Sequence, residues 1–258
     1  MTQPDRMPVM FVGHGNPMNA IEHNAFSAQW AELGRTLPKP KAIVCLSAHW
    51  ETEGLRVTSS AQPETIHDFY GFPKALFDVQ YRAPGDPALA REIVDLLKPT
   101  QVTEDEQRGL DHGVWGVLAP MFPEADIPVV QLSLWRGKSA RYHFELGQRL
   151  ATLRRQGVLV VASGNIVHNL RTFDFNATEA TPWAAEFDAK VQSALLSRDF
   201  DALVDYQSLG RQAASAIPSA EHYLPFVLTL GLVEPDDQIQ LFNPKTLSSI
   251  SMTSFLAS

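Results

Sequence analysis

Short apolar runs alternate along this chain with amphipathic stretches. The runs cover residues 7–12, 42–46, 127–134 and 158–162, and they are rich in β-branched side chains. Runs of this length and composition are typical of strands that are buried on both faces of a parallel sheet. We therefore predict four central strands that are joined through helices, as in βαβ units.

The stretches between the runs carry helical signals. Phe26, Trp30, Leu33 and Leu37 recur at helical spacing, and Pro38 follows them. A residue that favours helix N-termini precedes each of three further periodic stretches, at Asp86-Pro87, Ser139 and Thr181-Pro182. These signals predict three helices, which begin after Asp86, Ser139 and Thr181. The apolar positions extend to residue 97 in the first and to residue 195 in the third, and we expect Gly157 to cap the end of the second.

Two segments differ from this pattern. Residues 77–82 alternate strictly between apolar and polar, which predicts a strand with one solvated face. Residues 238–255 are rich in Ser and Thr with spaced apolar positions, and we expect one or two further strands there. The predicted fold is a single α/β domain with a mainly parallel, mixed central sheet that is covered by helices on both faces.

Composition and charge exclude several classes of function. The chain has 258 residues and a net charge of −8, and it has no basic cluster of the kind that binds nucleic acid. The lone Cys45 excludes a disulfide framework and a thiolate metal site. No apolar run reaches the ~18 residues of a membrane span, and residues 1–6 do not resemble a secretory signal. We expect a soluble cytoplasmic protein without a nucleic-acid or membrane partner.

The eight histidines are the unusual feature of the chain. His14, His49 and His168 each follow a predicted strand within a few residues, and in an open α/β sheet ligands bind outside the carboxyl ends of the strands. His112 lies in a loop that leads into a short apolar helix. His222 lies close after Ser219, which we expect to cap a helix that has His222 in its first turn and is bent at Pro225.

The other histidines have less specific contexts. His67 lies in an aromatic-rich loop, where packing is the alternative to a functional role. His23 and His143 lie among polar neighbours on predicted helices, so we expect them to be solvated or to cap helix ends.

Imidazoles without thiolates narrow the candidate metals to Zn(II) and Fe(II). Three such ligands with open positions are typical of a metal that must bind water or substrate. Spacing alone leaves both a zinc hydrolase and an iron oxygenase open. The chain has no Gly-x-Ser-x-Gly nucleophile elbow, and Gly13-His14-Gly15-Asn16 lacks the features of a phosphate-binding loop.

Six sequence blocks that occur in order resemble one known family. They are GHGNPMN at 13–19, LSAHW at 46–50, TIHDFYGFP at 65–73, LDHGVWG at 110–116, ASGNIVHNL at 162–170 and EHYLP at 221–225. Together they resemble the 4,5-DOPA extradiol dioxygenase family, within the class III extradiol ring-cleaving dioxygenases. The resemblance extends from about residue 8 to residue 256.

This resemblance implies one catalytic domain over residues 1–258 and one divalent metal, Fe(II) for catalysis or Zn(II) as found bound. It implies His14, His49 and His222 as metal ligands. His168 is then a catalytic acid/base, or a fourth ligand when Zn is bound, and His112 a catalytic residue that hydrogen-bonds substrate or oxygen. The implied substrate-binding residues are His67, Phe69, Tyr70 and Trp50.

The implied reaction inserts O₂ into a small catechol outside its two hydroxyls and gives a ring-opened semialdehyde. Arg171, Arg136 and Arg82 are candidates for binding an acidic group of the substrate. The alternatives are a zinc-dependent hydrolase or another non-oxidative metalloenzyme on the same scaffold, and a non-catalytic binding protein. The natural catechol and the oligomeric state stay open.

Overall fold

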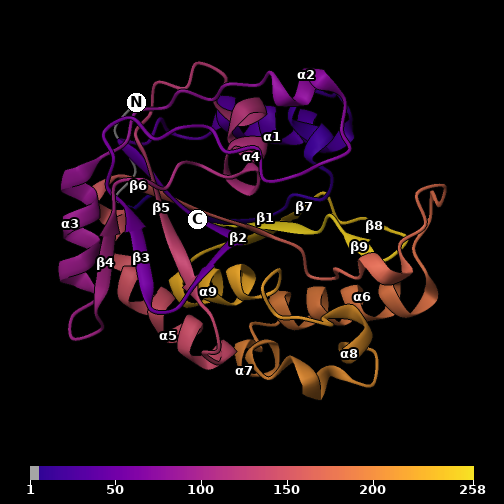
Figure 1. The fold of residues 1–258 in the computed structure, drawn as a ribbon. Coiled ribbons are helices and arrows are strands. Elements are labelled where there is room, and N and C mark those ends of the chain that lie inside the picture. The colour runs from indigo at the N-terminus through magenta and orange to yellow at the C-terminus, as the bar shows by residue number, and fades with distance from the viewer. Residues whose placement is uncertain (1–5) are drawn as a thin grey trace.

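An eight-stranded mixed sheet runs through the molecule in the order β4-β3-β5-β2-β6-β1-β10-β7 (Figure 1). The computed structural model describes residues 6–258; residues 1–5, which belong to the stretch where we expected no secretory signal, lie outside the described residues. The strands are β1 (Val9–Gly13), β2 (Ala42–Thr52), β3 (Leu55–Thr58), β4 (Val102–Asp105), β5 (Val129–Trp135), β6 (Val158–Gly164), β7 (Ile239–Phe242), β8 (Thr246–Leu247), β9 (Ile250–Ser251) and β10 (Ser254–Ala257). β8 and β9 pair separately as a small antiparallel ribbon.

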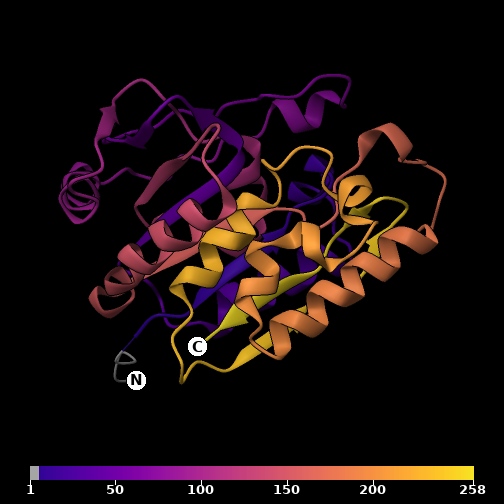
Figure 2. The same ribbon diagram turned by 90° about the horizontal axis from the view of Figure 1, so that it is seen from below.

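Helices cover both faces of the sheet, as predicted. The α-helices are α1 (Ala25–Thr36), α2 (Lys74–Phe77), α3 (Pro87–Leu96), α4 (His112–Met121), α5 (Ala140–Leu150), α6 (Pro182–Leu196), α7 (Phe200–Val204), α8 (Ala213–Ala216) and α9 (Leu224–Leu232). Short 3-10 helices are η1 (Pro17–Ala20), η2 (Ala151–Gln156), η3 (Leu170–Thr172) and η4 (Tyr206–Leu209). In Figure 1, α1 and α4 lie above the sheet and α5, α6 and α9 below it, and Figure 2 shows the lower layer from beneath.

The four predicted central strands form the parallel middle of the sheet, β5-β2-β6-β1. Alternate residues of each strand enter two different cores. Val9 and Phe11 of β1 pack in the core with α5, α6 and α9, whereas Met10 and Val12 pack in the core with α1 and α4. Because both faces are buried, these strands consist of continuous apolar runs. The predicted α/β class with a mixed sheet is confirmed.

The predicted helices are present, and Asp86 and Ser139 cap α3 and α5 as expected, whereas the Thr181 side chain makes no capping bond to α6. Asn24 caps α1 through bonds to the amides of Phe26 and Ser27. Asp86 caps α3, whose first residue is Pro87. The stretch after Ser139 is divided into α5 and η2, and Gly157 ends η2 with φ +87°, the left-handed conformation that glycine adopts without strain.

The predicted strand over residues 77–82 is wrong. α2 ends at Phe77, and an irregular segment follows it. The amide of Tyr81 donates to the side-chain oxygen of Thr65, and its phenol donates to the carbonyl of Phe122. These side chain–backbone bonds, and not strand pairing, hold Tyr81 in its buried position. The alternation of apolar and polar residues over 77–82 therefore does not mark a strand.

The end of the chain contains more strands than the one or two that we expected. β7 and β10 extend the main sheet with antiparallel pairing, and β8 and β9 form the ribbon. Among residues 6–258, no helix has the length and apolar character that crossing a membrane requires.

Candidate metal centre

Three histidines lie at the carboxyl edge of the neighbouring strands β2, β6 and β1. His14 directly follows β1, and His168 lies in the loop after β6. His49 lies within β2, which is longer than predicted. The register between β2 and β5 shifts between Leu46 and Glu51, and such irregularities change the direction of a strand's side chains. His14, His49 and His168 therefore lie at one edge of the sheet, as predicted.

Close backbone packing fixes the loop of His14. A Cβ at Gly13 would lie 2.7 Å from the carbonyl carbon of Met252, and one at Gly15 would lie 2.3 Å from the Met252 sulfur. Gly15 also has φ +58°, a conformation that favours glycine. The side-chain amide of Asn19 donates to the His14 carbonyl at 3.0 Å. These contacts explain why glycine flanks this histidine on both sides.

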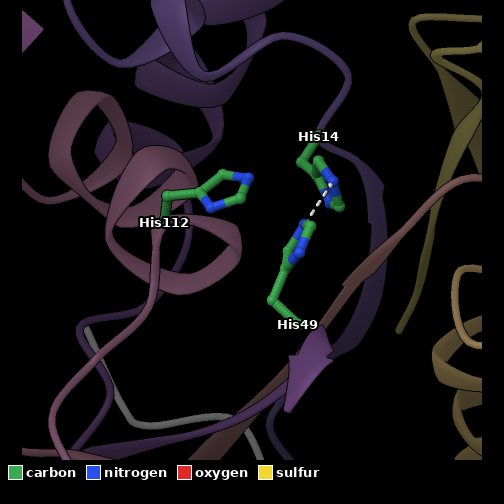
Figure 3. A group of neighbouring side chains, drawn as sticks. All are labelled: His14, His49 and His112. Carbon is green, nitrogen blue, oxygen red and sulfur yellow. Dashed lines mark hydrogen bonds between the residues drawn. The ribbon is translucent and has the colours of Figure 1, made fainter. Parts of the chain in front are cut away.

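The rings of His14, His49 and His222 form a nearly equilateral group. Their centroids are 5.1 Å (His14–His49), 5.4 Å (His14–His222) and 5.1 Å (His49–His222) apart. The Nε2 atoms of His14 and His49 are 3.3 Å apart. His112, the first residue of α4, adds a ring 4.0 Å from that of His49. Figure 3 shows His14, His49 and His112 converging from a loop, a strand and a helix.

Two subsets of this group have closely spaced ligand atoms. One nitrogen each of His14, His49 and His112 lies within 4.8 Å of the others, and the same is true of atoms from His168, Glu221 and His222. The ring of His168 stacks on that of His222 at 3.5 Å and 7°. The structure thus brings together all five histidines that the sequence singled out, and His112 lies closer to His49 than His222 does.

The expected helix around His222 is wrong. His222 lies in a turn before α9, and the Ser219 hydroxyl bonds to Glu221 rather than capping a helix. Pro225 lies in the first turn of α9, where a missing amide breaks no helical hydrogen bond, so it does not bend the helix. The turn is held by the amide of Asn165, which donates to the His222 carbonyl at 2.9 Å.

Three of the imidazoles have one nitrogen engaged outside the group. The Nδ1 atoms of His14, His222 and His112 lie 2.9, 3.1 and 2.8 Å from Ser163 Oγ, Glu221 Oε1 and Asp68 Oδ1. Such partners fix the ring orientation and the tautomer of metal-ligating histidines. Ser163 and Asp68 were not among the predicted site residues. The feature of the sequence that could have indicated Asp68 is its position directly after His67 in the aromatic loop.

The donor set fits a divalent metal. His222 Nε2 is buried and has no hydrogen-bond partner, an arrangement that is costly unless a further ligand occupies the position. Burial, followed by the charges of neighbouring imidazoles, lowers the pKa of His14 and of His222 well below the usual range. Burial also lowers the pKa of His49 and of His168 to about 4. Neutral imidazoles of this kind offer lone pairs to a metal.

A buried carboxylate, that of Asp111, is linked to the backbone of His49 through the Ser47 hydroxyl. Asp111, which is fully buried, accepts from the Ser47 hydroxyl at 2.7 Å and from the Gln131 amide at 2.6 Å. Ser47 Oγ in turn accepts from the His49 amide at 3.1 Å, and Arg108 donates at 3.1 Å to Asp111 Oδ2, the oxygen that also accepts from Gln131. The carboxylate therefore has a cation and two neutral donors as partners, as a buried charge requires.

The predicted substrate-binding residues have different placements. Phe69 lies 5.6 Å from the ring of His112. His67 packs on Trp115, and its Nε2 lies 3.0 Å from the Val79 carbonyl oxygen. Trp50 is 5% exposed beneath the Arg108 guanidinium, so little of its surface is free for a ligand, whereas Tyr70 is 92% exposed.

The candidate arginines and the other two histidines also differ in placement. Arg82, Arg136 and Arg171 are all exposed. His23 is exposed as expected, but the prediction of a surface position for His143 is wrong because its side chain is fully buried. Its Nε2 lies 3.3 Å from the Trp135 amide, and its Nδ1 lies 2.9 Å from the Ser139 carbonyl oxygen. These two bonds satisfy the ring inside the protein.

Comparison with known proteins identifies the family to which this geometry belongs. Residues 8–254 match the family described as the catalytic LigB subunit of aromatic ring-opening dioxygenase. The chain therefore belongs to this family. The prediction of an oxidoreductase of the extradiol dioxygenase type is confirmed.

Individual relatives are similar over almost the whole chain. A 4,5-DOPA dioxygenase extradiol of Escherichia coli K12 is 48% identical over 242 residues, which cover 92% of this chain and 89% of the relative. A protein of the same name from Beta vulgaris is 38% identical over 239 residues, with 90% and 89% covered. The crystal structure of an uncharacterized protein from Escherichia coli K12 superposes with a TM-score of 0.87 at 42% identity and covers 98% of this chain and 100% of that one.

Proposed function

We propose that this enzyme opens the ring of a DOPA-like catechol outside its two hydroxyls, with both atoms of O₂ entering the product, a ring-opened semialdehyde. The observation that carries the proposal is the group of five facing imidazoles at the carboxyl edge of the sheet, in a chain of the ring-opening dioxygenase family. The DOPA-like substrate is inferred from the names of the relatives from Escherichia coli and Beta vulgaris.

His14, His49 and His222 are the proposed ligands of one divalent metal, Fe(II) for catalysis. Their similar mutual ring distances and the unpartnered Nε2 of His222 support this set over one that contains His112. When bound, the metal supplies positive charge that lowers the pKa of catechol hydroxyls. The Nδ1 partners Ser163 and Glu221 keep two of the three rings directed at the centre.

His168 is the proposed proton acceptor. Its ring lies beside that of His222, and because burial lowers its pKa it is neutral near pH 7. A ring nitrogen can therefore accept a proton from a catechol hydroxyl whose own pKa a bound metal would have lowered. The same residue returns this proton later in the reaction. Its stacked position over His222 also brings it near enough to become a fourth ligand of Zn(II).

His112 and the aromatic loop form the proposed substrate side. A small cavity of about 10 Å³, room for one water molecule, lies between η1 and α4 and is lined by His14, Asn16, Pro17, His112 and Gly116. His112 forms a hydrogen bond with substrate or oxygen through its other ring nitrogen in this proposal. Phe69, which contacts the His112 ring, supplies an apolar wall for an aromatic ring.

Oxygen uptake with and without the ligands tests the proposal. Protein that is loaded anaerobically with Fe(II) should consume O₂ when L-DOPA or catechol is added, and it should form a coloured ring-opened product. His14→Ala should abolish both signals, because removing a ligand empties the site. The control is His23→Ala, which replaces an exposed histidine and should behave like the wild type.

Two results would contradict the proposal. Undiminished oxygen uptake in His14→Ala would refute the site. Turnover of an ester or amide substrate by the Zn(II) form, without oxygen uptake by the Fe(II) form, would favour the non-oxidative metalloenzyme instead.

A further inference from the structure

A carboxylate from the aromatic loop holds the start of α4. Asp68 Oδ1 accepts from the backbone amide of His112 at 3.0 Å and lies 2.8 Å from Nδ1 of the same residue. Asp111 occupies the N-cap position of this helix but makes no capping bond with its side chain, which is engaged by Ser47, Gln131 and Arg108. Asp68 therefore satisfies a helix amide that the local N-cap leaves free.

Hydrogen bonds hold the loop, up to Asp68, against α4 and the residues just before it. The Ile66 amide donates to the Leu110 carbonyl, and the Trp115 indole donates to the Ile66 carbonyl, both at 2.8 Å. Beyond Asp68 the chain turns outward, with Tyr70 92% exposed and Gly71 at φ +77°. Asp68 is thus the last fixed point before the exposed turn.

The same carboxylate determines what faces the histidine group. With Nδ1 held by Asp68, the other nitrogen of the His112 ring is turned toward His14, as Figure 3 shows. Phe69, the next residue in the loop, lies 5.6 Å from the His112 ring and 6.0 Å from that of Trp115. The Asp68 side chain thereby holds Nδ1 of His112 at the point of the loop where Phe69 packs beside the same ring.

We propose that Asp68 is a positioning residue, which fixes the His112 imidazole through Nδ1 and places Phe69 beside it on the substrate side of the site. Its effect on turnover rests on the proposed ring-opening function; its effect on the His112 tautomer does not. An imidazole that donates Nδ1–H to Asp68 keeps its Nε2 for the interior of the site. Without Asp68 the ring can rotate and exchange tautomers.

The experiment compares Asp68→Ala and Asp68→Asn with a matched capping variant, Asp86→Ala. Asp86 accepts from two backbone amides of α3, those of Ala88 and Leu89, both at 3.0 Å, and α3 carries none of the five histidines. Loss of either cap should lower stability by about 1 kcal/mol. Long-range ¹H–¹⁵N spectra of the diamagnetic Zn(II) protein report the histidine tautomers, and steady-state kinetics of the Fe(II) protein report turnover.

Asp68→Ala should lose the Nδ1–H signal of His112 and lower kcat by about 10–100-fold, with Zn(II) affinity close to that of the wild type. Asp68→Asn keeps an accepting oxygen and should restore much of both readouts. Asp86→Ala should change neither.

Three results would overturn the proposal. The first is an unchanged His112 spectrum in Asp68→Ala. The second is an equal loss of kcat in Asp86→Ala, which would make the effect one of stability alone. The third is a loss of Zn(II) affinity as large as in His14→Ala, which would make His112 a ligand. If wild-type protein consumes no oxygen, the ring-opening function fails, but the tautomer measurement still decides the role of Asp68.

Discussion

Gly164→Ala is expected to disable the metal centre by displacing a backbone atom. Gly164 is the last residue of β6, and a Cβ there would lie 2.2 Å from the carbonyl oxygen of His222, whereas ordinary contacts begin at 3.4 Å. The His222 turn must therefore retreat by about 1 Å to reach van der Waals distance. The retreat also stretches the 2.9 Å bond from the Asn165 amide to the same oxygen.

The size of this shift sets the expected effect. A misplacement of about 1 Å in a group that positions reacting atoms costs roughly 100-fold in rate. Disturbing the surroundings of a metal ligand costs about 10–100-fold in metal affinity. Overpacking a filled interior costs about 1–3 kcal/mol, which a domain with a stability of about 5–15 kcal/mol tolerates. Gly164→Ala should therefore fold, bind Zn(II) 10- to 100-fold more weakly by the same scale, and turn over catechol about 100-fold more slowly.

Competition with a chromogenic chelator measures the affinity, and thermal unfolding measures the stability. The control is Gly85→Ala, whose Cβ would lie 1.9 Å from the Ser60 carbonyl oxygen, an equally severe contact with backbone in the turn before α3. It should lose stability but keep wild-type metal affinity. Wild-type affinity in folded Gly164→Ala, or an equal loss in Gly85→Ala, would refute this reasoning.

Two further predictions concern Glu221 and Asp237. Glu221→Ala removes the Nδ1 partner of His222 and should lower Zn(II) affinity by about 10–100-fold in the same chelator assay, whereas wild-type affinity would show that the tautomer is fixed otherwise. Burial alone would raise the pKa of Asp237, but its hydrogen bond from Arg154 and nearby positive charges outweigh burial and lower the pKa below 3.8. The stability from this pair is therefore present above pH 3.8 and is lost as the pH falls through the lower, folded-state pKa. Asp237→Asn should cost about 3–5 kcal/mol in urea unfolding near neutral pH and flatten the acid limb, and an equally steep acid limb would contradict the assignment.

The parallel centre of the fold could be predicted because burial on both faces leaves a continuous apolar run. The outer strands β3 and β4 could not, since each has only four residues and exposes polar positions such as Arg56 and Glu104. His143 shows the opposite case, because the signal was available. It shares one face of α5 with Leu146, Gly147 and Leu150, the i, i+3, i+4, i+7 spacing of a buried stripe. Its polar sequence neighbours concealed that periodicity.

The candidate histidines could be predicted because they follow strands, but their supporting contacts could not. Asp68 and His112 are 44 residues apart, and Gly164 meets His222 across 58 positions of sequence. No local sequence pattern predicts either of these two contacts. The loop conformations that bring these residues together depend on packing between elements, which a single sequence does not display.

The Ser/Thr-rich end of the chain forms more strands than predicted, and its hydroxyls have an interior role that the sequence does not indicate. Ser251 and Thr253 are buried, and their hydroxyls donate to the carboxylate of Asp188 on α6 at 2.7 and 2.8 Å. The same segment reaches both candidate loops, since the Ser251 amide donates to the Val167 carbonyl and Met252 packs against Gly13. Because a buried carboxylate requires donors, these hydroxyls are interior hydrogen-bonding groups rather than solvent-facing ones. This segment therefore holds the His14 and His168 loops in register with each other.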